Sequence, residues 1–473
     1  MALPLLITPA SAQSRNDNWF LDPSNWISFA FGSPTNVNGS PFNAASGASM
    51  SEPSGQLSMY TNGQVLLNAD HLILTGSSGL LQGSANAQPH LILPMPGDPD
   101  RYAVFSSDAS PDPRCGWLTV NMTLDAGLGA VEGAEMEWFM KYPNYASGKL
   151  SAAPHANGSD YWVLLHEQWT NAFFAYQLTP QGLDSIPVIS YAGVSHDPAH
   201  YDGQIVVSYA GDLSATTACY NAEPFPGDSN YLQLFHFDNS LGEMEFLFDI
   251  PGFRKPFGVE FSPDGSKLYV TDEYSTPGSI HLLLWQFDLA DLDPSAVLSS
   301  KEIVWHDSTL FSFSNSYKIL ALAPDGKIYY RHRSDTSYLG VVNDPNQTAA
   351  ACAFVENGFL CSNDSIRGLP NLCKRYHDSE APWTLITSPR PADGGLRIIP
   401  NPMTETAMLM TRNDRHPEKL NWFDTSGRLV HIATIDGMNE SVLIDRGSLR
   451  SGPYFIEVLD ARGVIGLVKI MIR

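Results

Sequence analysis

The sequence predicts an all-β protein in which an N-terminal β-propeller of six or seven blades is followed by a smaller strand-rich module. Two features indicate the propeller: a run of alternating strands joined by tight turns, and the return of that unit along the chain. A change of composition near the end of the chain separates the module. We expect the propeller to cover residues 13–373, a polar linker 374–395 and the module 396–473.

The clearest unit lies in residues 255–289, which read as three consecutive strands. Phe257, Val259 and Phe261 alternate with smaller or polar residues, so the first strand has one apolar face. Residues 262–265 (Ser-Pro-Asp-Gly) predict a tight turn, because proline presets φ and glycine accepts a positive φ. We expect this unit to bury its apolar face against similar neighbours.

The same unit returns about sixty residues later, as repeated architectures require. Leu320–Tyr330 again gives a strand, a Pro-Asp-Gly turn and a strand, and looser copies begin at Ser51, Leu93, Ala152 and Tyr209. Repeats of about 40–50 residues, each a small antiparallel sheet, are typical of a β-propeller. The aromatic stretch Trp19–Phe31 precedes the first copy, and it could supply the outer strand that closes the ring against the last blade.

Composition narrows the possible partners. The 473 residues favour two domains, and the formal net charge of −23 argues against nucleic acid and anionic lipid as ligands. Calcium or a cationic partner would suit an acidic surface, although acidity also serves solubility. Only 16% of the residues are charged, which fits an extracellular all-β protein.

The start of the chain is similar to the second half of a secretory signal peptide. Residues 1–12 combine a short apolar run with Ala10-Ser11-Ala12, an Ala-x-Ala cleavage pattern, so the mature chain would begin near Gln13. No other stretch approaches the roughly 18 apolar residues of a membrane span. We therefore expect export without a transmembrane segment.

The five cysteines are too few and too irregularly spaced for a disulfide scaffold or a zinc site. Cys352 and Cys361 could form a local disulfide in an oxidising compartment, and a reduced pair is the alternative. The odd number leaves at least one thiol unpaired within the chain.

Residues 396–473 contain about seven short strands with regular turns, which predicts an immunoglobulin-like β-sandwich. Four elements follow one another in this module: Pro400, Asn401 and Pro402; Asp424, Gly427 and Arg428; Gly452 and Tyr454; and Lys469 in the last strand. Together they resemble the type A C-terminal sorting domain of the type IX secretion system of Bacteroidota. The resemblance implies the type IX machinery as a partner, passage through the periplasm, and a secreted or outer-membrane-surface location. The region before the module resembles the WD-repeat-like propeller of surface proteins from the same bacteria, which implies a fold and a location but no activity.

Two loops offer candidate metal ligands. His196, Asp197, His200 and Asp202 place two imidazoles and two carboxylates within seven residues, a set that could hold a metal. The loop lacks the helix that a His-Glu-x-x-His zinc site requires, so a solvated loop is the alternative. The carboxylates of Asp288, Asp291 and Asp293 could bind calcium or could simply form a hydrophilic turn.

Acid–base residue types are scattered through the propeller region: His155, His166, Glu167, His306 and Asp307. The pair Asp272-Glu273 follows the strongest strand and could face the central channel. We find no spacing that joins these residues into a known catalytic set, and no nucleophile-elbow, phosphate-loop or dinucleotide motif.

The sequence therefore favours a protein-binding, glycan-binding or scaffold role at the cell surface. Two alternatives stay open: a metal-dependent propeller lyase or hydrolase acting on extracellular polysaccharide, and a structural subunit of a surface layer or filament.

Overall fold

The computed structural model describes residues 14–472 except 23–24, 31, 38–46, 82–87, 109–112, 142, 197–202, 220–229, 310–318, 333–336, 362–367, 378–396, 400–402, 411–415, 424–427, 436–440, 448, 451 and 461–462. The chain forms two compact units, Met1–Leu385 and Ile386–Arg473. The signal-peptide region predicted at residues 1–12 lies outside the described residues.

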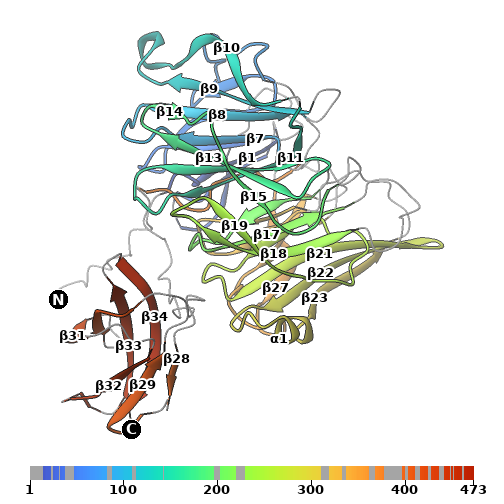
Figure 1. The fold of residues 1–473 in the computed structure, drawn as a ribbon. Helices are drawn as coiled ribbons and strands as arrows, with labels where there is room; N and C mark the ends of the chain where they lie inside the picture. The colour runs from blue at the N-terminus through green and yellow to red at the C-terminus, as the bar shows by residue number, and fades with distance from the viewer. Residues whose placement is uncertain are drawn as a thin grey trace, which may run out of the picture. The chain divides into compact units, whose positions relative to one another are not determined.

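The described part of the first unit consists of seven antiparallel sheets, each built from strands that are consecutive in the chain (Figure 1). Sheet 1 contains β1 (Asn18–Asp22), β2 (Asn25–Ser28) and β3 (Thr35–Val37), and sheet 2 contains β4 (Ala48–Ser51), β5 (Leu57–Thr61) and β6 (Leu66–Asn68). Sheet 3 contains β7 (His90–Pro94), β8 (Arg101–Asp108), β9 (Arg114–Asn121) and β10 (Ala130–Met140). Sheet 4 contains β11 (Ala146–Pro154), β12 (Tyr161–Glu167), β13 (Ala172–Thr179), β14 (Gly182–Leu183) and β15 (Val188–Tyr191), which also pairs with β13.

The other sheets of this unit have four strands each. Sheet 5 contains β16 (Ile205–Val207), β17 (Leu213–Ala218), β18 (Tyr231–Asp238) and β19 (Glu243–Asp249), and sheet 6 contains β20 (Val259–Phe261), β21 (Lys267–Thr276), β22 (Ser279–Asp288) and β23 (Glu302–Thr309). Sheet 7 contains β24 (Leu320–Leu322), β25 (Ile328–Tyr330), β26 (Tyr338–Val342) and β27 (Phe354–Leu360). The described helices are short: η1 (Asp125–Gly127) and α1 (Pro294–Ser299).

The predicted Pro-Asp-Gly turns form as expected. Gly265 has a φ of 68°, and its N–H donates to the carbonyl oxygen of Ser262 at 2.8 Å. Gly326 repeats the arrangement with a φ of 78° and a 3.0 Å hydrogen bond to the carbonyl oxygen of Ala323. Both turns join the first and second strands of their sheets, as the alternating pattern predicts.

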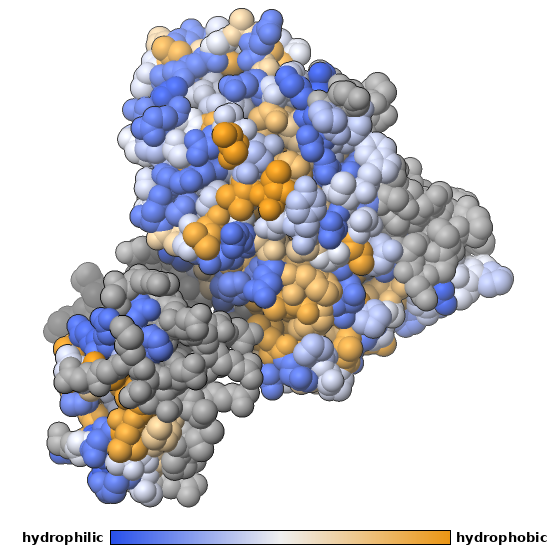
Figure 2. Space-filling model, viewed as in Figure 1, coloured by the Kyte–Doolittle hydropathy of each residue, from blue (hydrophilic) through white to orange (hydrophobic). Residues whose placement is uncertain are grey.

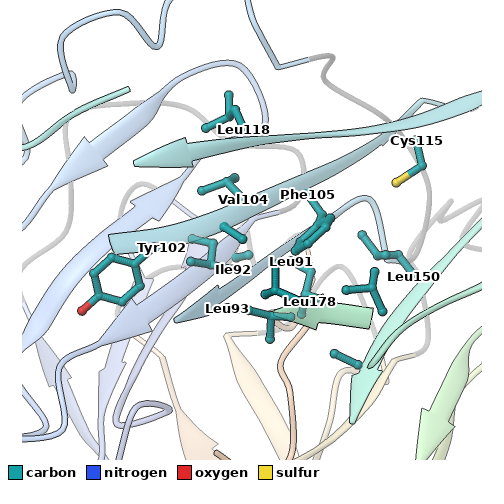
Figure 3. Packing of buried hydrophobic residues seen from close by; sticks show 14 of the residues in the cluster. Leu91, Ile92, Leu93, Tyr102, Val104, Phe105, Cys115, Leu118, Leu150 and Leu178 are labelled. Atoms are coloured by element: carbon teal, nitrogen blue, oxygen red, sulfur yellow. The ribbon is translucent and has the colours of Figure 1, made fainter. Parts of the chain in front are cut away.

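Successive sheets pack face to face. The first strands lie side by side in chain order, β4 against β7, then β11, β16, β20 and β24. Between sheets 3 and 4, apolar side chains from both sides form one core, with Leu91 and Phe105 on one side and Leu150 and Leu178 on the other (Figure 3). This is the propeller-like arrangement expected from the repeats, because each sheet buries its faces against two neighbours.

The ring closes between sheets 1 and 7. The ring of Tyr329 on β25 meets Trp19 with the centroids 5.5 Å apart and Phe29 at 5.6 Å. Asn36 of sheet 1 also donates its side-chain amide to the carbonyl oxygen of Leu360 at 2.7 Å. The described part of the aromatic stretch Trp19–Phe31 therefore packs against the last sheet, but it forms β1 and β2 of a separate sheet and does not supply the outer strand of sheet 7.

The meander topology gives the unit two different edges. We call the side that carries the first-to-second-strand turns, such as 155–160, 208–212 and 262–266, the short-turn edge. The second-to-third-strand and sheet-to-sheet connections begin and end at the opposite side, and they include the longer segments 192–204, 219–230 and 310–319. We call this side the long-connection edge.

β1 begins at the short-turn edge, since the side-chain amide of Asn18 donates to the carbonyl oxygen of Gly55 in the β4–β5 turn at 2.8 Å. Residues 369–377 follow sheet 7 in the chain and lie against first strands of other sheets. The Asn371 amide donates to the carbonyl oxygens of Leu150 on β11 at 2.8 Å and of His90 on β7 at 3.1 Å. This segment therefore ties the end of the unit to sheets 3 and 4.

Residues 374–377, which the sequence assigns to the linker, pack on the first unit. Lys374 forms an ion pair with the buried Glu260, and Tyr376 is only 2% exposed. The His377 imidazole lies 2.7 Å from the carbonyl oxygen of Asp160, next to the β11–β12 turn. The last described residue of this unit therefore lies at the short-turn edge.

The second unit has two antiparallel sheets. One contains β28 (Arg397–Ile399), β29 (Thr406–Met410) and β32 (Ser441–Asp445); the other contains β31 (Leu429–Thr434), β30 (Lys419–Phe423), β33 (Gly452–Asp460) and β34 (Gly463–Ile472). Leu409 and Ile444 of the first sheet share a core with Trp422, Ile456 and Ile470 of the second.

The five cysteines are buried thiols, and no disulfide joins Cys352 to Cys361. The two belong to different cores, with Cys352 beside Tyr269 and Cys361 beside Trp19, so the possible bridge is not formed. Among the described residues, no helix is long and apolar enough to cross a membrane.

Candidate functional site

The densest predicted ligand cluster starts at His196, on the connection between β15 and β16. Its other members, Asp197, His200 and Asp202, lie outside the described residues. His196 is buried, and its ring stacks on that of His166, with the centroids 3.8 Å apart and the planes at 22°. The structure thus joins two histidines that are thirty positions apart in the sequence and that no motif connects.

Burial and a nearby cation define the state of this pair. Burial, together with the positive charge of the buried Lys149, lowers the pKa of His166 to about 3. His166 is therefore neutral at physiological pH. We call Lys149, His166 and His196 the histidine cluster.

All three members of the histidine cluster are buried: Lys149 and His166 are 0% exposed and His196 is 1% exposed. The cluster is thus a buried polar site at sheet 4 and the connection that follows it.

Trp169 lies directly beside the cluster, on the connection between β12 and β13. Its N–H donates to the carbonyl oxygen of His196 at 2.6 Å, and the N–H of His196 donates to the carbonyl oxygen of Thr170 at 3.0 Å. These two hydrogen bonds tie the β12–β13 connection to the β15–β16 connection at the long-connection edge.

The conformation of Trp169 is unusual in two respects. Its φ is 68°, in the left-handed region that bulky residues avoid, and its side chain is 53% exposed. The indole meets the ring of Tyr145 edge-on, at 5.1 Å and 61°. Backbone strain and an exposed large aromatic ring at the same residue indicate a functional position rather than a packing role. We call Tyr145 and Trp169 the aromatic platform.

Polar side chains surround the platform and are held in place. Glu167 accepts hydrogen bonds from the Asn144 amide at 2.6 Å and from the Thr170 hydroxyl at 2.7 Å. We call Asn144, Glu167 and Thr170 the polar rim. A flat apolar surface beside oriented hydrogen-bonding groups can hold an organic ligand without any covalent chemistry.

The other predicted site residues have structural partners. Oδ1 of Asp272 accepts three backbone hydrogen bonds, from Arg254 at 3.0 Å, Lys255 at 2.7 Å and Glu273 at 3.0 Å. Burial raises the pKa of Asp272 to about 6, although these N–H groups and Lys301 oppose the shift. The carboxylate therefore fastens the β19–β20 connection to β21, and Glu273 forms an ion pair with Lys255 at 3.9 Å.

The predicted calcium loop is likewise held by its own bonds. Asp288 lies 2.9 Å from the ammonium of Lys267, and Asp291 accepts the N–H of Asp293 at 3.2 Å. Asp293 caps α1 by accepting the N–H of Ala296 at 3.0 Å. In the described part of the chain, no three or more His, Cys, Asp or Glu residues are grouped so that they could hold a metal ion.

The remaining acid–base candidates are spread over the unit. His155 stacks on Trp162 at the short-turn edge, with centroids 5.0 Å apart. His306 on β23 lies 3.0 Å from His281 on β22, ring nitrogen to ring nitrogen, and Asp307 is its neighbour in the chain. Only His166 and Glu167 of this group lie beside the aromatic platform.

A second exposed feature lies on the outer strands of sheets 4 and 5. Ile186, Ile189, Tyr191, Leu241 and Phe246 are exposed, and β15 packs against β19. Figure 2 shows hydrophobic residues gathered on this part of the first unit among hydrophilic ones. A surface of this kind is a common contact area in proteins.

In the second unit, four of the residues predicted as the sorting signal are described, namely Arg428, Gly452, Tyr454 and Lys469. Pro400, Asn401, Pro402, Asp424 and Gly427 lie outside the described residues. The Tyr454 hydroxyl donates to the carbonyl oxygen of Arg450 at 3.0 Å, and Lys469 pairs with Phe455 between β34 and β33.

Residues 397–473 match the family model described as the secretion system C-terminal sorting domain. This stretch is a type IX sorting domain. The sorting domain implies an interaction with the type IX secretion machinery, and it places the protein outside the cell or on the outer-membrane surface.

Solved structures similar to the chain are distant. A putative 6-phosphogluconolactonase from Bacteroides uniformis is 12% identical, covers 65% of this chain and 91% of its own, and has a TM-score of 0.33. The periplasmic gluconolactonase of Pseudomonas aeruginosa is 12% identical and has a TM-score of 0.35. The match covers 82% of this chain and 94% of the gluconolactonase. A quinoprotein alcohol dehydrogenase-like protein from Bacteroides thetaiotaomicron is 10% identical and has a TM-score of 0.37. The match covers 75% of this chain and 77% of that protein. No curated protein matches the chain.

Proposed function

We propose that the protein is a ligand-binding module displayed outside the cell, and that it binds its ligand at the long-connection edge of the first unit. The observation that carries this proposal is Trp169, whose indole is exposed while its backbone is held at a positive φ by the hydrogen bond to His196. Folding alone favours neither feature, so a bound ligand is the best reason for both.

The route of the chain supports the choice of edge. The sorting domain follows the first unit in the sequence, and the last described residue of that unit, His377, lies beside the β11–β12 turn. His377 thus lies at the short-turn edge, while the aromatic platform lies at the long-connection edge.

For the architecture, we propose a seven-bladed propeller followed by an immunoglobulin-like sandwich. The seven sheets and the packing of sheet 1 against sheet 7 support the first part. The two sheets with one shared core support the second.

Photo-crosslinking on intact producing cells tests the function. A photoreactive residue would replace Lys141 in the connection next to the aromatic platform, or Ser159 in the β11–β12 turn as the matched control; both positions are exposed. We expect a reproducible crosslinked partner from position 141 and none from position 159. Equal capture from the two positions, or none from position 141, would contradict the proposal. Crosslinks only between copies of this chain would instead favour a structural-subunit role.

A further inference from the structure

We infer that the ligand of the aromatic platform is a neutral glycan, one pyranose ring of which stacks on Trp169. This inference rests on the proposed function and adds the chemical class of the ligand. It is carried by three properties of the site: the shape of the aromatic surface, the chemistry of the polar rim and the charge of the protein.

The aromatic surface has the shape that a sugar ring needs. The rings of Tyr145 and Trp169 pack at 61° to each other and not as a parallel stacked pair. The residue Trp169 is 53% exposed. A pyranose presents a flat face of C–H groups, which pack on the electron-rich face of an aromatic ring. The platform therefore offers a stacking surface of the size of a single sugar ring.

The polar rim suits hydroxyl groups. Glu167 accepts one amide hydrogen of Asn144 at 2.6 Å and the hydroxyl hydrogen of Thr170 at 2.7 Å, which orients both side chains. Asn144 keeps a second amide hydrogen and a carbonyl oxygen, so it can both donate and accept. Sugar hydroxyls also both donate and accept, and a rim that is fixed before binding lowers the entropy lost on association.

Charge favours a neutral glycan over a cation or an acidic polysaccharide. Both oxygens of Glu167 already accept hydrogen bonds, and only 8% of the residue is exposed, so its carboxylate is a poor partner for a cationic ligand. Cages for quaternary ammonium groups place several aromatic faces around the cation, whereas the platform consists of two rings packed against each other at 61°. The net charge of −23 repels polyanionic glycans at long range.

The test is a binding titration of the full chain with cellohexaose, mannohexaose and galactohexaose, followed by calorimetry. We expect at least one of the three to bind. Trp169→Ala should weaken that binding about tenfold or more, and Trp169→Tyr should keep it within about threefold, since tyrosine retains a stacking face. Tyr191→Ala, which removes another exposed aromatic ring of the same sheet, is the matched control and should leave affinity unchanged. Thermal unfolding of each variant shows whether the fold is intact.

Absence of binding to all three hexasaccharides would overturn the inference, as would equal losses from Trp169→Ala and Tyr191→Ala. Capture of a protein alone by a photoreactive residue at position 141 would also overturn it, while leaving the proposed binding function in place. Failure of capture at position 141 would instead remove the proposed function itself. Should Trp169→Ala unfold, Trp169→Gly replaces it, because glycine accepts the φ of 68°.

Discussion

The backbone N–H of Trp169 donates a 2.6 Å hydrogen bond to the carbonyl oxygen of His196, so the exposed indole and the buried imidazole are positioned by the same contact. This hydrogen bond holds Trp169 in the left-handed region and joins two connections of the long-connection edge. The platform is therefore a product of tertiary structure, and its strain can be measured.

The strain at Trp169 predicts an order of stability between two substitutions. Trp169→Ala and Trp169→Gly both remove the contact with Tyr145, but only glycine accepts a φ of 68° without cost. We expect the free energy of unfolding of Trp169→Gly to exceed that of Trp169→Ala by about 1 kcal/mol. Urea unfolding followed by far-ultraviolet circular dichroism measures the difference. An alanine variant as stable as the glycine variant would show that this backbone is not strained.

Asp272 predicts a pH-dependent stability. The pKa of Asp272 is near 3.8 in the unfolded chain and about 6 in the folded protein, because burial disfavours the charged carboxylate. The folded state therefore prefers the protonated form, and Asp272 lowers the free energy of unfolding as the pH rises from about 4 to about 6. Asn resembles the protonated carboxyl and can still accept at Oδ1, so Asp272→Asn should stabilise the protein by roughly 1–3 kcal/mol at pH 7.5. This gain should disappear near pH 4.

The matched control for this experiment is Asp288→Asn, for which we expect the opposite sign. Burial raises the pKa of Asp288, but the hydrogen bond from the N–H of Ala290 and the charge of Lys267 outweigh burial and lower it overall. Asp288 thus stabilises the fold above its unfolded pKa, and that stabilisation is lost as the pH falls. Thermal unfolding from pH 4 to pH 8 compares the two variants; a gain from Asp272→Asn that is constant over this range would contradict the account of Asp272.

The hydrogen bonds from Asn371 to two first strands predict a strong effect of its substitution. Asn371→Ala would leave the carbonyl oxygens of Leu150 and His90 without this donor, which should cost roughly 2–4 kcal/mol. Asn36→Ala is the matched control, since Asn36 also bridges distant parts of the ring but is exposed; we expect it to cost less than about 1 kcal/mol. Denaturant unfolding separates the two cases, and similar losses would mean that residues 369–377 do not hold the ring together.

The sheets could be predicted from the sequence because their signals are local. The alternation of Phe257, Val259 and Phe261 and the turn at Gly265 depend only on neighbouring residues, and both appear in β20 and the following turn. The course of residues 369–377 could not be predicted in this way. The segment shows no strand alternation, and the place of Asn371 is fixed by hydrogen bonds to strands more than two hundred positions away.

The site was only partly predictable. His196 stood out by composition, but its partner His166 belongs to a buried strand, where a histidine carries no distinctive spacing. Trp169 was missed because its positive φ follows from the hydrogen bond to His196. The run His166-Glu-Gln-Trp-Thr-Asn171, with a tryptophan among polar residues between two apolar strands, is the signal that could have indicated it.

A ligand-binding role outside the cell requires export of the chain, and one measurement tests this export directly. The full chain and a version lacking residues 396–473 would be expressed in a bacterium with a type IX secretion system, then located by cell fractionation and by surface labelling of intact cells. We expect the full chain, and equally its Trp169→Ala variant, at the surface or in the medium, and the shortened chain in the periplasm. Surface labelling of the shortened chain at the level of the full chain would contradict the role of the sorting domain.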